Sequence, residues 1–286
     1  MRAGHNISLA SLALIGAMIA PCALQAADVP AMGGGYTDVI PIPVEDPAVK
    51  DIAGALIKPQ GAGPFPVVVY IPACGGPNFP LELKQEKFWI ERLQSKGIAT
   101  FVVDPLMPRG LDQGNCDKLL TVLDDVRNKN EGVLQMLTQV GDDTVAALKV
   151  VKAMPDIDPK KVFLMGFSYG ATATLYATNP KGPGKSDTEI AGVVAYYPLC
   201  DDKAEASVPT LILIGEKDDW TGPVSSCEAL TGKDKFDVAV YPGATHAFTM
   251  QFDQPFDFAG HHLAYDEAST MEATQRAEAF IDRLLK

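Results

Sequence analysis

Positive charge is scarce in this sequence. Its 24 lysine and arginine residues are outnumbered by 36 aspartate and glutamate residues, and the formal net charge is −12 at pH 7. An acidic surface repels the phosphate groups of nucleic acids and of anionic lipids. We therefore expect neither nucleic acid nor, after removal of any leader, a membrane among the partners of this chain.

The sequence also lacks common metal-binding patterns, because it contains neither a C-x-x-C nor an H-E-x-x-H motif. We therefore expect no metal and no cofactor. There is no internal repeat and no low-complexity linker, and beyond the N-terminal segment no apolar run approaches the roughly 20 residues that a membrane-spanning helix needs. Within 286 residues, these absences favour one domain of ordinary size, or at most two small ones.

The first 27 residues are typical of a secretory signal peptide. Arg2 precedes an apolar run from Ile7 to Ala20, and small residues then lead to Ala26 and Ala27. The alternative is a membrane anchor, but the apolar run is short for a span and no basic flank follows it. We predict an exported protein, periplasmic or secreted, in which residues 28–286 form the mature domain.

Apolar runs of strand length alternate with helix-favouring segments along the rest of the chain. The expected strands are Asp51 to Lys58 at an edge, Val67 to Ile71, Ile98 to Val103, Val162 to Met165, Ile190 to Tyr197, Thr210 to Ile214 and Phe236 to Tyr241. The expected helices are Phe88 to Lys96, Leu119 to Asn128, Val133 to Met154, Ala171 to Ala177 and Glu267 to Leu285. This alternation predicts an α/β fold with one mostly parallel sheet, helices on both faces and no large lid domain.

The segment Gly166-Phe167-Ser168-Tyr169-Gly170 joins an expected strand to an expected helix. It matches the G-x-S-x-G pattern of a nucleophile elbow, a sharp turn that lifts a serine hydroxyl clear of its neighbours. The glycines let strand and helix approach closely, and the N–H of Tyr169 at the helix start can stabilise an oxyanion. An ordinary strand-to-helix turn is the alternative interpretation.

A nucleophilic serine needs a base and an orienting acid, which in such folds follow in the order serine, acid, histidine. His246 follows the last expected strand and is the candidate base, with His261 or His262 as the fallback. Asp218 follows the preceding strand and is the candidate acid. Its neighbour Asp219 competes for that role, although a helix cap or a solvated side chain explains Asp219 as well.

A second oxyanion donor is expected from the glycine-rich loop after the strand that ends at Ile71. Cys74 and Gly75 offer backbone N–H groups there. Cys74 could itself be a nucleophile, but the elbow already supplies a serine, so we favour a disulfide for this cysteine.

These residues together resemble the dienelactone hydrolase family of α/β hydrolases, particularly its exported bacterial members. The resemblance covers nearly all of the mature domain, from about Val67 to the last helix. It is carried by the Cys74-Gly75-Gly76 loop, Asp104 to Gly110, the elbow, Gly215 to Asp218 and Tyr241 to Phe248. It implies an α/β-hydrolase fold, and the G-x-x-D pattern of the family places the acid at Asp218.

The sequence departs from the family at two points. Members that open dienelactones carry a cysteine at the elbow and a glutamate in the loop after the first central strand, whereas this chain has Ser168 and Pro72-Ala73 there. Neither the thiolate mechanism nor the dienelactone specificity therefore carries over. Arg109 is similar in position to a family contact with a substrate carboxylate, although pairing with a nearby aspartate explains it equally well. Trp220 is a candidate for the substrate pocket wall.

Four cysteines remain once Cys22 leaves with the signal peptide. An even number in an exported protein indicates disulfides. Because the cysteines follow neighbouring strands, we predict the pairs Cys200–Cys227 and Cys74–Cys116.

The sequence thus predicts an exported serine hydrolase that cleaves small carboxylic esters or lactones through an acyl-enzyme. A monomer or weak oligomer is expected. The alternatives are a peptidase or acyltransferase with the same three residues, and a non-catalytic binding protein on the same fold.

Overall fold

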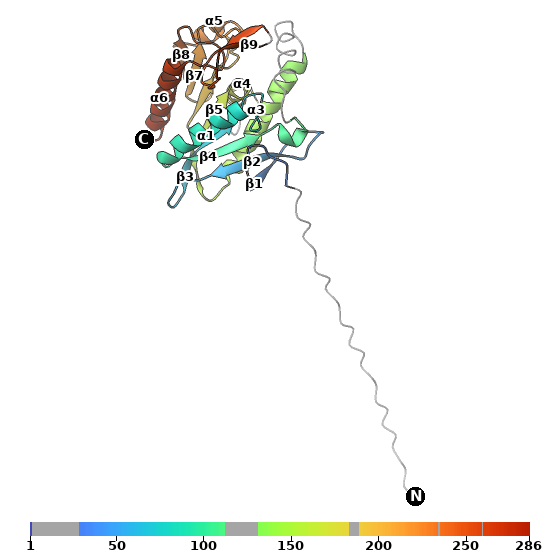
Figure 1. Ribbon diagram of the computed structural model, residues 1–286. Coiled ribbons are helices and arrows are strands. Elements are labelled where there is room, and N and C mark those ends of the chain that lie inside the picture. Colours follow the sequence, from blue (N-terminus) through green and yellow to red (C-terminus); the bar gives the residue numbers. More distant parts are fainter. Residues whose placement is uncertain (2–28, 112–130, 183–188, 234, 259) are drawn as a thin grey trace.

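The computed structural model describes residue 1 and residues 29–111, 131–182, 189–233, 235–258 and 260–286 (Figure 1). Residues 2–27 of the predicted signal peptide, its boundary with the mature domain and the predicted helix at 119–128 lie outside these ranges. No helix in the described ranges has both the length and the apolar composition needed to cross a membrane.

The centre of the fold is an eight-stranded sheet in the order β1-β2-β4-β3-β5-β6-β7-β8. The strands are β1 Val39–Pro43, β2 Asp51–Ile57, β3 Phe65–Ile71, β4 Ala99–Asp104, β5 Ile157–Phe167, β6 Gly192–Tyr196, β7 Thr210–Gly215 and β8 Phe236–Tyr241. The six strands from β4 to β8 in this order run parallel, while β2 and β1 add antiparallel strands at one edge. The predicted mostly parallel sheet is confirmed. The strand β1 was not among the expected strands, and because it pairs with β2, the predicted edge position of β2 is wrong.

Helices cover both faces of this sheet. They are α1 Pro80–Ser95, α3 Glu131–Lys152, α4 Tyr169–Ala177, α5 Val224–Glu228 and α6 Glu267–Leu284, with a single 3-10 turn η1 at Met107–Arg109. Alternate residues of β3 point to opposite faces. Val69 joins the core beneath α3 and α4, whereas Val68 joins the core beneath α1 and α6.

Helix α1 begins at Pro80, eight residues before the predicted start at Phe88. Proline is well suited to the first turn of a helix, where its missing N–H costs no hydrogen bond. In this first half of the helix, the polar residues Glu82, Gln85 and Glu86 are buried. Their i, i+3, i+4 spacing places them on one face of the helix, which is turned toward the sheet.

A small hairpin, β9 Phe256–Phe258 and β10 His261–Leu263, precedes α6. The sequence predicted only a loop here. Leu263 forms a bridge with His246, so the hairpin is attached to the loop that follows β8. The hairpin therefore lies beside the carboxyl ends of the parallel strands, where ligands bind in α/β folds.

Candidate active site

Ser168 occupies a strained turn between β5 and α4. Its backbone has φ 51° and ψ −113°, a conformation that residues other than glycine rarely adopt. A Cβ atom on Gly166 would lie 2.4 Å from the carbonyl oxygen of Gly170, and one on Gly170 would lie 2.4 Å from that of Ile71. Both glycines of the motif are therefore required by the close approach of strand and helix.

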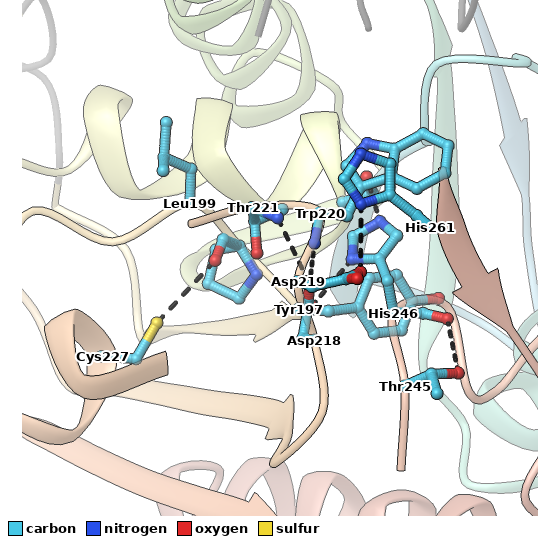
Figure 2. Close-up of polar contacts among 12 residues, drawn as sticks. Tyr197, Leu199, Asp218, Asp219, Trp220, Thr221, Cys227, Thr245, His246 and His261 are labelled. Carbon is cyan, nitrogen blue, oxygen red and sulfur yellow. Dashed lines mark hydrogen bonds and ion pairs between the residues drawn. The ribbon is translucent and has the colours of Figure 1, made fainter. Parts of the chain in front are cut away.

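His246 and Asp218 form a continuous chain of contacts with this serine. Ser168 Oγ lies 2.9 Å from His246 Nε2. His246 Nδ1 lies 2.8 Å from Asp218 Oδ2 (Figure 2). The other oxygen of Asp218 accepts the backbone N–H groups of Trp220 at 3.1 Å and Thr221 at 3.2 Å. With the imidazole proton on Nδ1 facing the carboxylate, Nε2 is free to accept the serine proton.

Two aromatic rings confine the imidazole of His246. The indole of Trp220 stacks on it with ring centres 5.3 Å apart and 14° between the planes, and Tyr197 packs edge-on at 5.0 Å (Figure 2). Ser168, His246 and Asp218 are all buried. The packing thus restricts rotation of the ring away from the serine hydroxyl.

The competing residues named from the sequence lie elsewhere. Asp219 Oδ1 is 3.1 Å from His261 Nδ1, and His262 Nδ1 is 2.8 Å from Asp257 Oδ1. Figure 2 shows Asp219 and His261 as a pair separate from the contact between Asp218 and His246. Neither fallback histidine takes the place of His246 beside Ser168.

A cavity of about 270 Å³ adjoins Ser168 and His246. Its remaining wall consists of Ala73, Cys74, Gly75, Phe79, Glu82, Trp220, Ala247, Met250, Phe252, Phe256, Phe258 and Leu263. Trp220, the sequence-based candidate for the substrate pocket, lines this cavity, and the hairpin β9–β10 contributes three apolar side chains. Within the described residues this wall includes no lysine or arginine.

The loop after β3 carries the two donor candidates that the sequence named, the N–H groups of Cys74 and Gly75. The N–H of Gly75 donates to Glu82 Oε1 at 2.8 Å, so this predicted oxyanion donor is already engaged. Cys74 lies in the cavity wall and takes part in a disulfide. Tyr169 follows Ser168 directly, and its side chain packs in the core beneath α3 and α4 rather than in the cavity wall.

Arg109 has a different environment from the one its family position implied. Its guanidinium donates to both oxygens of Asp143 at 2.8 and 3.0 Å, to Asp46 at 2.6 Å and to the carbonyl of Pro105 at 2.6 Å. The side chain is buried and does not line the cavity beside Ser168. The structure therefore corrects the predicted substrate contact in favour of the alternative, a pairing with nearby aspartates.

Glu82 and Glu86 are two buried acids that sequence reasoning missed. Burial raises the pKa of Glu82 to about 8, against hydrogen bonds from backbone N–H groups that favour its ionised form. Burial likewise raises the pKa of Glu86 to about 7, although Tyr36 donates a hydrogen bond to it. The only sequence signal for them was the i, i+3, i+4 spacing of Glu82, Gln85 and Glu86. This spacing places three polar residues on one helix face, but it does not tell whether that face is exposed or buried.

One of the two predicted disulfides is present between described residues. Cys200 and Cys227 are bonded, with Cα atoms 5.1 Å apart, and the bond links the loop after β6 to α5. Cys116, the predicted partner of Cys74, lies outside the described residues.

The mostly parallel sheet, with a serine at the turn after β5 and an acid and a histidine after β7 and β8, defines an α/β hydrolase fold. The model of the dienelactone hydrolase family matches residues 52–285. The chain therefore belongs to the dienelactone hydrolase family.

Sequence and structure comparisons identify several similar proteins. The esterase FrsA of Escherichia fergusonii is 28% identical over 170 residues, which cover 58% of this chain and 34% of that protein. The chain thus spans about a third of the length of the curated relative it matches.

Solved structures are similar over most of the chain. A Klebsiella pneumoniae protein provisionally assigned as a dienelactone hydrolase has a TM-score of 0.61 at 19% identity, covering 85% of this chain and 97% of its own. Thermogutta terrifontis esterase 2 phosphorylated by paraoxon has a TM-score of 0.60 at 14% identity, with 91% and 98% covered. A dienelactone hydrolase-like promiscuous phosphotriesterase from metagenomic libraries has a TM-score of 0.57 at 17% identity, with 86% and 98% covered. At these identities the likeness shows the fold alone.

Proposed function

We propose that this protein is an exported serine hydrolase that cleaves carboxylic esters or lactones through an acyl-enzyme. The observation that carries the proposal is the continuous contact from Ser168 through His246 to Asp218. A serine hydroxyl, an imidazole acceptor and a buried carboxylate in this order are the groups that acyl transfer requires.

In the proposed reaction, Ser168 Oγ attacks the ester carbonyl while His246 Nε2 takes the hydroxyl proton. The same imidazole then donates this proton to the departing alkoxide, and the acyl group remains on Ser168. A water molecule then attacks the acyl-enzyme carbonyl while His246 takes its proton. Return of this proton to Ser168 Oγ releases the carboxylic acid. Throughout, Asp218 holds the proton of Nδ1 and stabilises the imidazolium that forms.

The negative charge on the carbonyl oxygen needs hydrogen-bond donors. The N–H of Tyr169 at the start of α4 is one candidate. The N–H of Cys74 is the other, because Gly75 is engaged by Glu82. The apolar wall of the cavity suits an uncharged acyl or alcohol group, and within the described residues it presents no cation to a substrate carboxylate.

Export is supported by the bond between Cys200 and Cys227, since disulfides form and persist in oxidising compartments. The composition of residues 1–27 supports the same location.

Labelling with a fluorophosphonate tests the proposal most directly. This class of reagent suits the fold, since paraoxon phosphorylates the similar Thermogutta terrifontis esterase 2. We expect the wild type to be labelled and Ser168→Ala not to be labelled, with ester turnover lost in the same variant. Labelling that persists in Ser168→Ala would remove this serine from its role.

Hydrolysis is then separated from the alternatives by its products. A panel of uncharged esters, lactones and peptides, each incubated with and without a competing alcohol or amine, distinguishes the three outcomes. Free acid from esters alone supports an esterase. Transfer of the acyl group to the added nucleophile identifies an acyltransferase, and cleaved peptides identify a peptidase.

A further inference from the structure

Glu82 is the one acidic side chain in the wall of the cavity beside Ser168, within the described residues. It comes from the first turn of α1 and is 3% exposed. Its Oε1 accepts the N–H of Gly75 at 2.8 Å, and its Oε2 has no hydrogen-bond partner in the described part of the chain. The carboxyl group therefore contacts the loop from which the second oxyanion donor is expected.

The surroundings of Glu82 favour its neutral form. The titratable groups that face it are Glu86 on the same helix, Tyr70 on β3, Tyr197 after β6 and His246 across the cavity. None of these offers a permanent positive charge. Burial raises the pKa of Glu82 to about 8, so at neutral pH the acid is mostly protonated.

The contact with Gly75 has a consequence for the oxyanion loop. An N–H that donates to a carboxyl group cannot also point at the substrate, so Gly75 is not the oxyanion donor and Cys74 is the candidate that this loop retains. A Cβ atom on Gly75 would lie 2.8 Å from Oε1, which shows how closely the loop is packed on this side chain. The conformation of the loop and the position of Glu82 are thus coupled.

On the basis of the proposed function, we propose that Glu82 is a positioning residue that fixes the oxyanion loop through Gly75 while remaining uncharged. A neutral acid holds the loop without placing a negative charge next to the one that develops on the substrate carbonyl. Ionised Glu82 would still hold the loop, but its charge would oppose the oxyanion and slow acylation. Glu82 therefore makes the site sensitive to alkaline pH.

The test measures the second-order rate constant of fluorophosphonate labelling from pH 6 to 10 for the wild type, Glu82→Gln, Glu82→Met and Glu86→Gln. Glutamine keeps an oxygen for Gly75 and cannot ionise, whereas methionine keeps the volume and removes the acceptor. Glu86→Gln is the matched control, because Glu86 is buried on the same helix and does not line the cavity. Burial raises the pKa of both Tyr70 and Tyr197, so they do not titrate in this range. Circular dichroism confirms folding at each pH.

We expect the wild-type rate constant to fall above pH 8, by at most about tenfold per pH unit, because one ionisation slows the reaction. In Glu82→Gln this alkaline decline disappears, while Glu86→Gln retains it. In Glu82→Met the rate constant at pH 7 falls roughly 10²- to 10³-fold, the size of effect that loss of one oxyanion donor produces. With an ester substrate this loss is expected in kcat rather than in KM.

An alkaline decline that persists in Glu82→Gln would overturn the proposal, as would a folded Glu82→Met with the wild-type rate constant. If Glu82→Met does not fold, the pH profiles of the two glutamine variants decide alone. Failure of the proposed function is a separate result, because the wild type would then show no labelling at Ser168 at any pH.

Discussion

Replacing Asp218 by asparagine tests the orientation of the imidazole. In the structure one carboxylate oxygen faces His246 Nδ1 at 2.8 Å, and the other accepts two backbone N–H groups, from Trp220 and Thr221. An asparagine can satisfy those two donors only with its oxygen. Its NH2 group must then face Nδ1, which forces the imidazole proton onto Nε2, and Nε2 can no longer accept the proton of Ser168.

The structure also sets the size of this effect. Restoring the correct tautomer requires the amide to flip, which turns its NH2 group toward two buried N–H donors and leaves both without an acceptor. Each buried unsatisfied donor costs about 1–3 kcal/mol. A flip therefore costs about 2–6 kcal/mol, and kcat should fall roughly 30-fold to 10⁴-fold.

Steady-state hydrolysis of an uncharged ester measures the loss, and chemical denaturation establishes that the variant is folded. The control is Asp219→Asn, which changes an exposed neighbour paired with His261 and should leave kcat within about twofold. Retention of more than a tenth of the wild-type kcat in Asp218→Asn would contradict this reasoning. A larger loss in Asp219→Asn than in Asp218→Asn would transfer the role of the acid to Asp219.

Three further predictions concern stability and specificity. Cys200→Ser combined with Cys227→Ser opens a loop between residues 27 apart and should lower the free energy of unfolding by about 3–4 kcal/mol in urea denaturation, with an unchanged midpoint as the contrary result. Arg109→Met leaves buried carboxylates without a counter-charge and should cost about 3–5 kcal/mol, whereas a raised KM for anionic esters at full stability would restore its substrate role. Folding raises the pKa of Glu86 from 4.5 to about 7. The contribution of protonated Glu86 to the free energy of unfolding is therefore complete below pH 4.5. It is lost as the pH rises through 7, by up to about 1.4 kcal/mol per pH unit. Glu86→Gln should therefore gain stability relative to the wild type between pH 5 and 8, and a constant difference in urea denaturation would contradict this.

The groups around Ser168 could be predicted because each is tied to a local pattern. A Cβ atom at either glycine of the elbow would lie 2.4 Å from a backbone carbonyl oxygen, so the motif reflects a three-dimensional constraint directly. Asp218 and His246 each follow an apolar run of strand length, and the carboxyl ends of parallel strands meet at one edge of a sheet. The positions of these residues in the chain were therefore enough to predict that they lie close together.

The first half of α1 could not be predicted in the same way. Glu82, Gln85 and Glu86 resemble a solvated surface in sequence, and only the tertiary structure turns this face inward. Gln85 accepts a hydrogen bond from Thr249 at 2.7 Å, a partner 164 residues away that no local pattern reveals. Arg109 was ambiguous for the same reason, because Asp46 and Asp143 are distant in the chain.

The departure from the family pattern is resolved by a carboxyl group that arrives from a different element. The loop after β3 has Pro72-Ala73 where dienelactone-opening members carry a glutamate, yet Glu82 of α1 places an acid against the same loop. In the proposed mechanism the hydroxyl of Ser168 depends on His246 for activation, unlike a thiol, which can ionise and benefits from a nearby proton acceptor. For a serine nucleophile, a charged acid in this position would only oppose the oxyanion. An acid that burial keeps neutral, and that is bonded to the backbone of Gly75, is therefore consistent with the replacement of cysteine by Ser168 at the elbow.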